Sequence, residues 1–133
     1  MSDGDVNPAA LKQPPFAEWL GIKMTHVSRE RVTAELIARD ELNNRHGITH
    51  GGAIMALADN LGGTATTANL KPGQMTTTIE SKTNFLGPAP VGATVTGETT
   101  PIHRGRRTQV WQTRITTAEG KLVAVVTQTQ MVL

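Results

Sequence analysis

The sequence contains no cysteine and no tyrosine, and it has only two phenylalanines and two tryptophans. Without cysteine the chain can form neither a disulfide nor a thiolate metal site, and it has no cysteine nucleophile. Because aromatic side chains are scarce, a core must be built mainly from valine, isoleucine, leucine, alanine and threonine. Few aromatics also leave little for stacking on nucleic-acid bases, so nucleic acid is the weaker explanation for any basic surface.

Long apolar runs and a basic start are also missing. The opening MSDGDVNPAALKQPP is acidic and contains proline, which excludes an ordinary secretory signal, and no segment approaches the length of a membrane span. We therefore expect a cytoplasmic protein without a membrane partner. With 133 residues, of which 38% are hydrophobic and 18% charged, the chain suits one folded domain. We expect a flexible leader over residues 1–13 and a single domain over residues 14–133.

Helical and strand patterns follow one another in a definite order. Pro14 and Pro15 can open a short helix with Phe16, Trp19 and Leu20 on one side, and Gly21 can end it. Strands are predicted over residues 23–28, 31–39, 74–85, 93–102, 108–117 and 122–132, the last as a central strand. Alternation places Met75, Thr77, Ile79, Ser81, Thr83 and Phe85 on one face of their strand, and Thr76, Thr78, Glu80, Lys82 and Asn84 on the other. Short turns imply antiparallel neighbours.

A long helical pattern begins at Gly51 and Gly52. Its apolar stripe consists of Ile54, Leu57, Ala58, Leu61, Ala65 and Ala68. At about 100° per residue, Asp59 lies roughly 140° from the centre of that stripe. It shares its side with Gly52, Met55, Gly63 and Thr66, so an acid stands among small residues that allow close approach. The predicted class is α+β, with this helix wrapped by an antiparallel sheet of five or six strands. One helix covers such a sheet only partly, so the second face of the helix, which carries Asp59, is left to face water or another subunit. We expect at least a dimer.

The residues around this helix resemble a known family. The pattern comprises Asn44, then His50, Gly51 and Gly52, then Asp59; supporting stretches are NFLGPAPVG, IHRGRRT and GKLVAVVTQT at residues 84–92, 102–108 and 120–129. It resembles the hotdog-fold acyl-CoA thioesterases, most closely the phenylacetate-degradation type, over residues 20–133. The resemblance implies the hotdog fold, homodimers that pair into homotetramers, and active sites at the dimer interface.

The resemblance also assigns chemistry to these positions. It implies that Asp59 attacks the thioester carbonyl itself or activates a water, since a thioester has a good leaving group. The Gly51 amide would bind the developing oxyanion, because the first N–H groups of a helix are unpaired and positively polarised. Gly52 would leave room for the acyl group. Asn44 and His50 would orient the acyl group or the water.

Coenzyme A phosphates need basic residues. Independently of the family, the bunching of Arg104, Arg106 and Arg107 indicates either a solvated surface or an anionic partner. The resemblance selects these arginines, with Gly105, Lys82 and Asn84, as candidate contacts for coenzyme A.

One position departs from aryl-CoA relatives: Gly63 stands where they often carry serine or threonine. Thr64 and Thr66 are the candidates to replace that hydroxyl.

Neither a metal nor a separate cofactor is expected. His46 and His50 stand four residues apart but precede the helix, and no glutamate lies between them as in a zinc protease motif. Three alternatives to hydrolysis stay open: a non-catalytic acyl-CoA-binding module, a hotdog dehydratase or hydratase, and, most distantly, a nucleic-acid-binding module. The dehydratase is disfavoured because its family carries an aspartate followed five residues later by histidine, ahead of the helix, and this sequence has no such pair.

Overall fold

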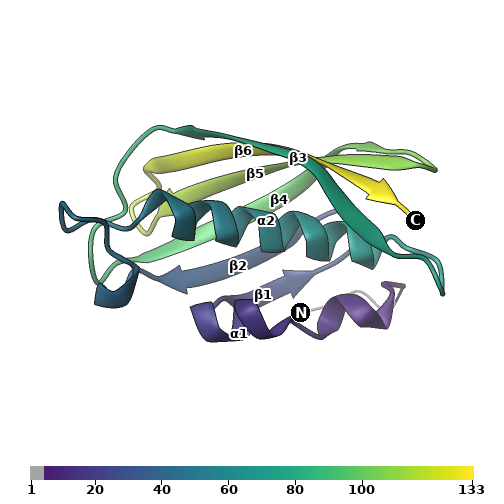
Figure 1. Ribbon diagram of the computed structural model, residues 1–133, viewed down its shortest axis with the longest axis horizontal. Helices are drawn as coiled ribbons and strands as arrows, with labels where there is room; N and C mark the ends of the chain where they lie inside the picture. Colours follow the sequence, from purple (N-terminus) through teal and green to yellow (C-terminus); the bar gives the residue numbers. More distant parts are fainter. Residues whose placement is uncertain (1–4) are drawn as a thin grey trace.

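A computed structural model describes residues 5–133, and its elements follow the predicted order (Figure 1). The helices are η1 (Pro8–Leu11), α1 (Pro15–Leu20), η2 (Asp40–Leu42) and α2 (Gly51–Ala68). The strands are β1 (Lys23–Val27), β2 (Val32–Ile37), β3 (Thr76–Phe85), β4 (Thr94–Arg104), β5 (Thr108–Thr117) and β6 (Leu122–Val132). The predicted α+β class is confirmed.

The six strands form one antiparallel sheet in the order β1-β2-β4-β5-β6-β3. Consecutive strands β4, β5 and β6 are neighbours because short turns join them. The long connection through α2 instead carries the chain from β2 to the opposite edge of the sheet, where β3 pairs only with β6. As predicted, β6 lies inside the sheet. Helix α2 runs roughly along the strands, over one face of the sheet (Figure 1).

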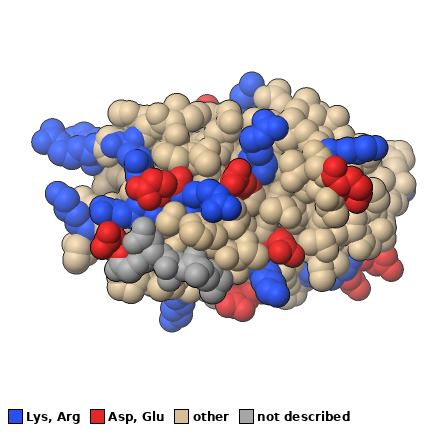
Figure 2. Space-filling view, turned by 180° about the vertical axis from the view of Figure 1, so that it is seen from behind, with Lys and Arg blue, Asp and Glu red and all other residues tan. Residues whose placement is uncertain are grey.

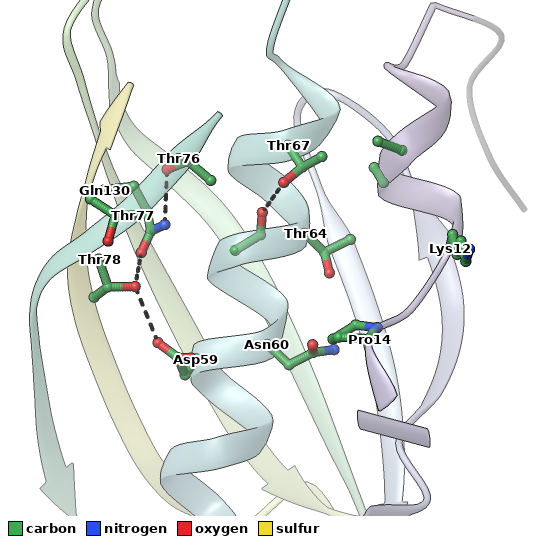
Figure 3. A pocket seen from close by; sticks show the side chains of 13 residues that line it. Lys12, Pro14, Asp59, Asn60, Thr64, Thr67, Thr76, Thr77, Thr78 and Gln130 are labelled. Atoms are coloured by element: carbon green, nitrogen blue, oxygen red, sulfur yellow. Dashed lines mark hydrogen bonds between the residues drawn. The ribbon is translucent and has the colours of Figure 1, made fainter. Parts of the chain in front are cut away.

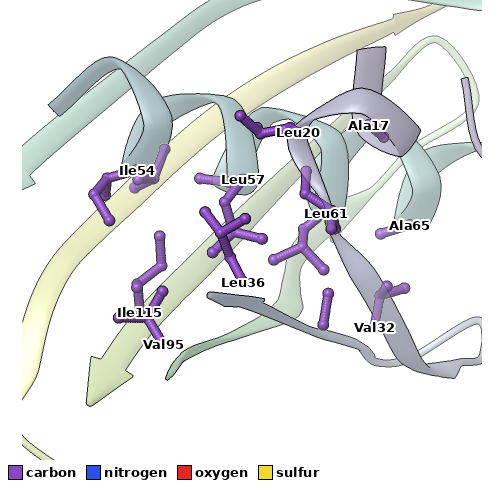
Figure 4. Packing of buried hydrophobic residues seen from close by; sticks show 14 of the residues in the cluster. Ala17, Leu20, Val32, Leu36, Ile54, Leu57, Leu61, Ala65, Val95 and Ile115 are labelled. Atoms are coloured by element: carbon purple, nitrogen blue, oxygen red, sulfur yellow. The ribbon is translucent and has the colours of Figure 1, made fainter. Parts of the chain in front are cut away.

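The predicted stripe of α2 forms the centre of the core. All six of its residues are buried against the sheet, and Figure 4 shows Leu57 and Leu61 packed among Leu36, Val95 and Ile115. Close approach of helix and sheet depends on Gly97 in β4, because a Cβ at this position would lie 2.4 Å from Leu61 Cδ1. The core stripe was predictable because it depends only on the helical period.

The short helix α1 is confirmed, and its side with Phe16, Trp19 and Leu20 is buried only at Leu20. Gly21 ends the helix at φ 86°, as expected for a left-handed C-terminal residue. Ala17 and Leu20 are buried, whereas Phe16 and Trp19 are 60% and 68% exposed. The Arg39 guanidinium lies 5.6 Å from the Trp19 ring centroid and donates to the Trp19 and Leu20 carbonyls. Ala17 and Leu20 are therefore the residues of α1 that join the core.

The prediction of a flexible leader is wrong for residues 5–13. Val6 and Ala10 belong to the buried core, and η1 packs on α2. Asn7 donates its backbone N–H to the Ala68 carbonyl and its side-chain Nδ2 to the Leu70 carbonyl, each at 3.2 Å. Two apolar side chains and an amide that satisfies helix-end carbonyls explain the packing. Residues 1–4 lie outside the described residues.

The predicted alternation along β3 is also wrong, because a β-bulge interrupts it. The register with β6 shifts between Thr78 and Glu80, so Ile79 is an extra residue. Thr78 and Phe85, which simple alternation places on opposite faces, therefore both face α2: Thr78 Oγ1 lies 3.5 Å from an Asp59 oxygen, and the Phe85 ring packs against Gly51. The bulge thus directs both ends of β3 toward the central helix.

Candidate active site

Asp59 lies on the exposed side of α2, as the helical period predicts. Its Oδ1 is 3.5 Å from Thr78 Oγ1, and Thr78 in turn donates to Gln130 Oε1 at 2.6 Å (Figure 3). Gln130 is buried and donates from Nε2 to Thr76 Oγ1 at 3.1 Å. Asp59 makes no ion pair with any residue from 5 to 133. The Asp59 carboxylate thus has a hydroxyl group nearby but no ion pair within residues 5–133, so it remains available for a ligand.

A cavity of about 380 Å³ opens beside Asp59. Helix α2, strands β3 and β6 and the N-terminal segment line it: Ala9, Ala10, Lys12, Pro14, Asp59, Asn60, Gly63, Thr64, Thr67, Thr76, Thr77, Thr78 and Gln130. Figure 3 shows the strand residues on one side of α2 and Lys12 and Pro14 on the other. Hydroxyl and amide groups supply much of this lining, so the cavity can solvate a polar reacting group.

The start of α2 offers one free backbone amide. His50 is the N-cap: its Nδ1 accepts the Gly52 N–H at 2.8 Å, and its carbonyl accepts the N–H of Ala53 and of Ile54. The Gly51 N–H has no acceptor among the described residues. A Cβ at Gly52 would lie 3.0 Å from His50 Nδ1, so glycine makes room for this cap. The cap therefore satisfies the other early amides and leaves that of Gly51 for a ligand.

Asn44 organises the loop before the helix. Its Oδ1 accepts the backbone N–H groups of His46, at 2.8 Å, and of Ile48, at 3.3 Å. Asn44 and Gly51 line a second, apolar cavity together with Phe85. His50 and Gly52 line a third, with Phe16 and Trp19. The predicted catalytic residues thus divide among three cavities within one chain.

Gly51 and Asp59 cannot act on one carbonyl from the same chain. They are eight positions apart on a straight helix, which corresponds to about 12 Å at 1.5 Å per residue. Hydrogen-bond donation to an oxyanion and attack on the same carbonyl carbon both require distances of about 3 Å. A site that uses both groups must therefore combine two protomers.

The expectation that Thr66 contacts the ligand is wrong. It is fully buried, and its hydroxyl donates to the Gly62 carbonyl at 2.9 Å. The helical period places it near Asp59 in angle, but neighbouring parts of the fold cover it. Thr64, the other candidate to replace the missing hydroxyl, lines the Asp59 cavity. Gly63 lines it as well, and a Cβ there would meet no atom within 4 Å.

The basic residues lie away from Asp59. Arg104, at the end of β4, donates to the Arg29 carbonyl at 3.1 Å and pairs with Glu30 at 3.4 Å; with Gly105 it lines a separate hollow. The side chains of Arg106 and Arg107 are exposed, and neither forms an ion pair within residues 5–133. Figure 2, from the opposite side of the molecule, shows Lys and Arg projecting at one end.

Lys82 and Asn84 lie on the face of β3 that points away from α2. Lys82 Nζ donates to Asn84 Oδ1 at 3.2 Å, so the two share a face. Phe85, the next residue, faces the helix, which places Asn84 on the other side of the sheet. Within one chain, neither residue can contact a ligand bound at Asp59.

Sequence reasoning missed Thr78 and Gln130 as neighbours of Asp59. No local signal marks them, because their position depends on the β3–β6 register and on the bulge.

Among the described residues, no cluster of three metal-ligating side chains occurs. No helix that the structure describes is long and apolar enough to cross a membrane.

The chain matches known proteins both in sequence and in structure. The family model of the thioesterase superfamily matches residues 46–124. A Haemophilus influenzae protein named as an esterase is 34% identical over 106 residues, which are 80% of this chain and 76% of that protein. The 1,4-dihydroxy-2-naphthoyl-CoA hydrolase of Listeria monocytogenes is 27% identical over 108 residues, 81% of this chain and 87% of the hydrolase.

The structural comparison agrees on the fold. The PaaI protein from the phenylacetic acid degradation operon of Escherichia coli superposes with a TM-score of 0.87 at 23% identity, over 94% of this chain and 88% of that one. The matched sequence segment contains His50, Gly51, Gly52 and Asp59, and the fold around them is the predicted one. The chain therefore belongs to the thioesterase superfamily: it is a thioester hydrolase with the hotdog fold.

Proposed function

We propose that this protein hydrolyses acyl-CoA thioesters to a free acid and coenzyme A, with Asp59 as the essential carboxylate and the Gly51 amide as the oxyanion donor. One observation carries the proposal. Helix α2 presents an amide at its first residue and, eight residues later, a carboxylate beside a polar cavity; in the described part of the chain the amide has no acceptor and the carboxylate no ion pair. These are the two groups that thioester hydrolysis needs: a donor for the carbonyl oxygen and a base or nucleophile for its carbon.

We further propose that the active site forms between two protomers of a homodimer. Within residues 5–133 the outer edge of β3 pairs with no strand, and Ile79 and Phe85 on it are 53% and 54% exposed. Antiparallel pairing of two such edges about a two-fold axis near the middle of β3 sets the Thr78 end of one strand alongside the Phe85 end of the other. Thr78 lies by Asp59 and Phe85 by Gly51, so this pairing brings each carboxylate toward the other protomer's free amide. Pairing of dimers into a tetramer remains our expectation from the family.

The hydrolysis can follow either of two balanced courses. As a general base, Asp59 removes a proton from water while the water oxygen attacks the carbonyl carbon. The carbonyl electron pair moves to oxygen, where the Gly51 N–H stabilises it. Collapse of this intermediate breaks the carbon–sulfur bond and releases coenzyme A thiolate, which takes up a proton. As a nucleophile, Asp59 forms a mixed anhydride with loss of the thiolate, and water then cleaves the anhydride.

Coenzyme A binding is supported by the basic turn after β4. Arg106 and Arg107 are exposed and make no ion pair with any described residue, so their guanidinium groups are available for phosphate oxygens. Arg104 already pairs with Glu30, so its guanidinium group is held in place but is less available for a phosphate.

The test is thiol release from a panel of acyl-CoA esters, measured with a thiol reagent. Asp59→Asn keeps the size of the side chain but removes the charge, so kcat should fall at least about 100-fold, the usual contribution of a positioned base. Glu119→Gln removes an exposed carboxylate from the β5–β6 turn and should retain wild-type kcat. Wild-type turnover by Asp59→Asn would refute the assigned role. Thermal stabilisation by CoA esters without turnover by the wild-type protein would instead indicate a binding module.

A further inference from the structure

The cavity beside Asp59 has a wall that lies outside the matched family segment. The thioesterase model matches residues 46–124, whereas Ala9, Ala10, Lys12 and Pro14 line the cavity from the N-terminal side. We call residues 5–14 the N-terminal strap. The family segment begins at residue 46 and therefore contains none of the strap.

The strap is anchored at both ends of the α2 segment that it covers. Near its start, Asn7 bonds the carbonyls of Ala68 and Leu70. Near its end, Gln13 Oε1 accepts from Asn60 Nδ2 at 2.7 Å, one residue after Asp59. The strap therefore runs antiparallel to α2, between anchors about 12 Å apart along the helix. Buried Ala10 holds the middle against the core.

The strap faces β3 across the cavity. Thr76, Thr77 and Thr78 form the opposite wall, and α2 forms the floor, where Gly63 leaves open space (Figure 3). The threonines belong to a strand that is paired with β6 throughout its length, so this wall cannot move without breaking the sheet. The strap and the Gln13–Asn60 hydrogen bond that tethers it next to Asp59 thus limit the width of the cavity.

We propose that the N-terminal strap determines which acyl groups fit beside Asp59, with Ala9 and the Gln13–Asn60 tether as specificity-determining elements. This role rests on the proposed function, since it takes the cavity as the place of the acyl group. The cavity admits compact acyl groups of about ring size, and the strap blocks long straight chains. Ala9 is exposed, so its small side chain is not required for core packing.

The experiment compares kcat/KM for acetyl-, phenylacetyl- and decanoyl-CoA. Ala9→Phe places a ring at the cavity wall, so the ratio of phenylacetyl-CoA to acetyl-CoA should fall about 10-fold, within the range that a few carbon atoms cause in a pocket. Gln13→Leu removes the tether, so the ratio of decanoyl-CoA to phenylacetyl-CoA should rise. Ala118→Phe, at an exposed alanine before the β5–β6 turn, is the matched control and should leave both ratios unchanged.

Binding measurements separate this proposal from the proposed hydrolysis. Non-hydrolysable thioether analogues of the same three esters give the order of affinities without turnover. If the wild-type protein binds them but hydrolyses no ester, and Ala9→Phe still selectively weakens the phenylacetyl analogue, hydrolysis is wrong and the strap's role stands. If turnover is normal and neither strap variant alters a ratio or an affinity order, the strap's role is wrong and hydrolysis stands. If no analogue binds and no ester is cleaved, both proposals are wrong.

Discussion

Two adjacent glycines in α2 differ sharply in what surrounds them. A Cβ at Gly62 would lie 2.2 Å from the side-chain amide of Gln128, which is 1% exposed and hydrogen-bonded to Gln130 at 3.0 Å. The amide is the end of a long side chain, but its burial and its hydrogen bond prevent it from turning aside. A Cβ at Gly63 would meet nothing within 4 Å. Only Gly62 is required by packing.

This contrast gives a prediction for stability. Gly62→Ala should lower the free energy of unfolding by about 1–3 kcal/mol, the usual cost of overpacking a core. Gly63→Ala should raise it by up to about 1 kcal/mol, because alanine favours a helix interior more than glycine does. Urea unfolding of both variants measures the difference. Equal destabilisation by the two substitutions would show that the packing around Gly62 is not as described.

At the scale of the element, the start of α2 depends on a side-chain cap. His50 Nδ1 accepts the Gly52 N–H at 2.8 Å, and the same turn leaves the Gly51 N–H free. The cap therefore stabilises the helix and preserves the amide assigned to the oxyanion.

The cap can be tested with two substitutions at the same position. His50→Ala removes the acceptor and should lower the free energy of unfolding by about 1 kcal/mol, whereas His50→Asn supplies another N-cap oxygen and should retain wild-type stability. Thermal or urea unfolding measures both. Comparable losses in the two variants would contradict the capping role. Turnover of the stable His50→Asn variant then reports any separate contact of the imidazole with substrate.

In strand β3 one extra residue changes which side chains face α2. The bulge at Ile79 lets Thr78 and Phe85 face the same helix from positions of opposite parity. Bulges commonly redirect side chains next to functional sites. Here the redirected residues contact Asp59 at one end and Gly51 at the other.

At the scale of the molecule, our proposal that Gly51 and Asp59 act on one carbonyl requires a dimer for activity, because the two residues are too far apart within one chain. Ile79→Asp would place a charge on the apolar part of the β3 edge that the proposed pairing covers, and burying an unpaired carboxylate there is costly. We expect this variant to sediment as a monomer and to lose hydrolysis. Ile37→Asp, on β2 and 58% exposed, is the matched control and should change neither property. A wild-type protein that hydrolyses acyl-CoA as a monomer would refute the shared site.

The sequence alone determined the features that depend on local spacing. The stripe from Ile54 to Ala68 and the outward position of Asp59 follow from the helical period, and the ends of β5 and β6 follow from alternation and turn residues. Only the tertiary structure decided which distant residues meet. The buried position of Thr66, the contact of Thr78 with Asp59 and the packing of the N-terminal strap on α2 all depend on long-range register and on covering surfaces. A helical period gives an angle around an axis, but it carries no information about what lies at that angle.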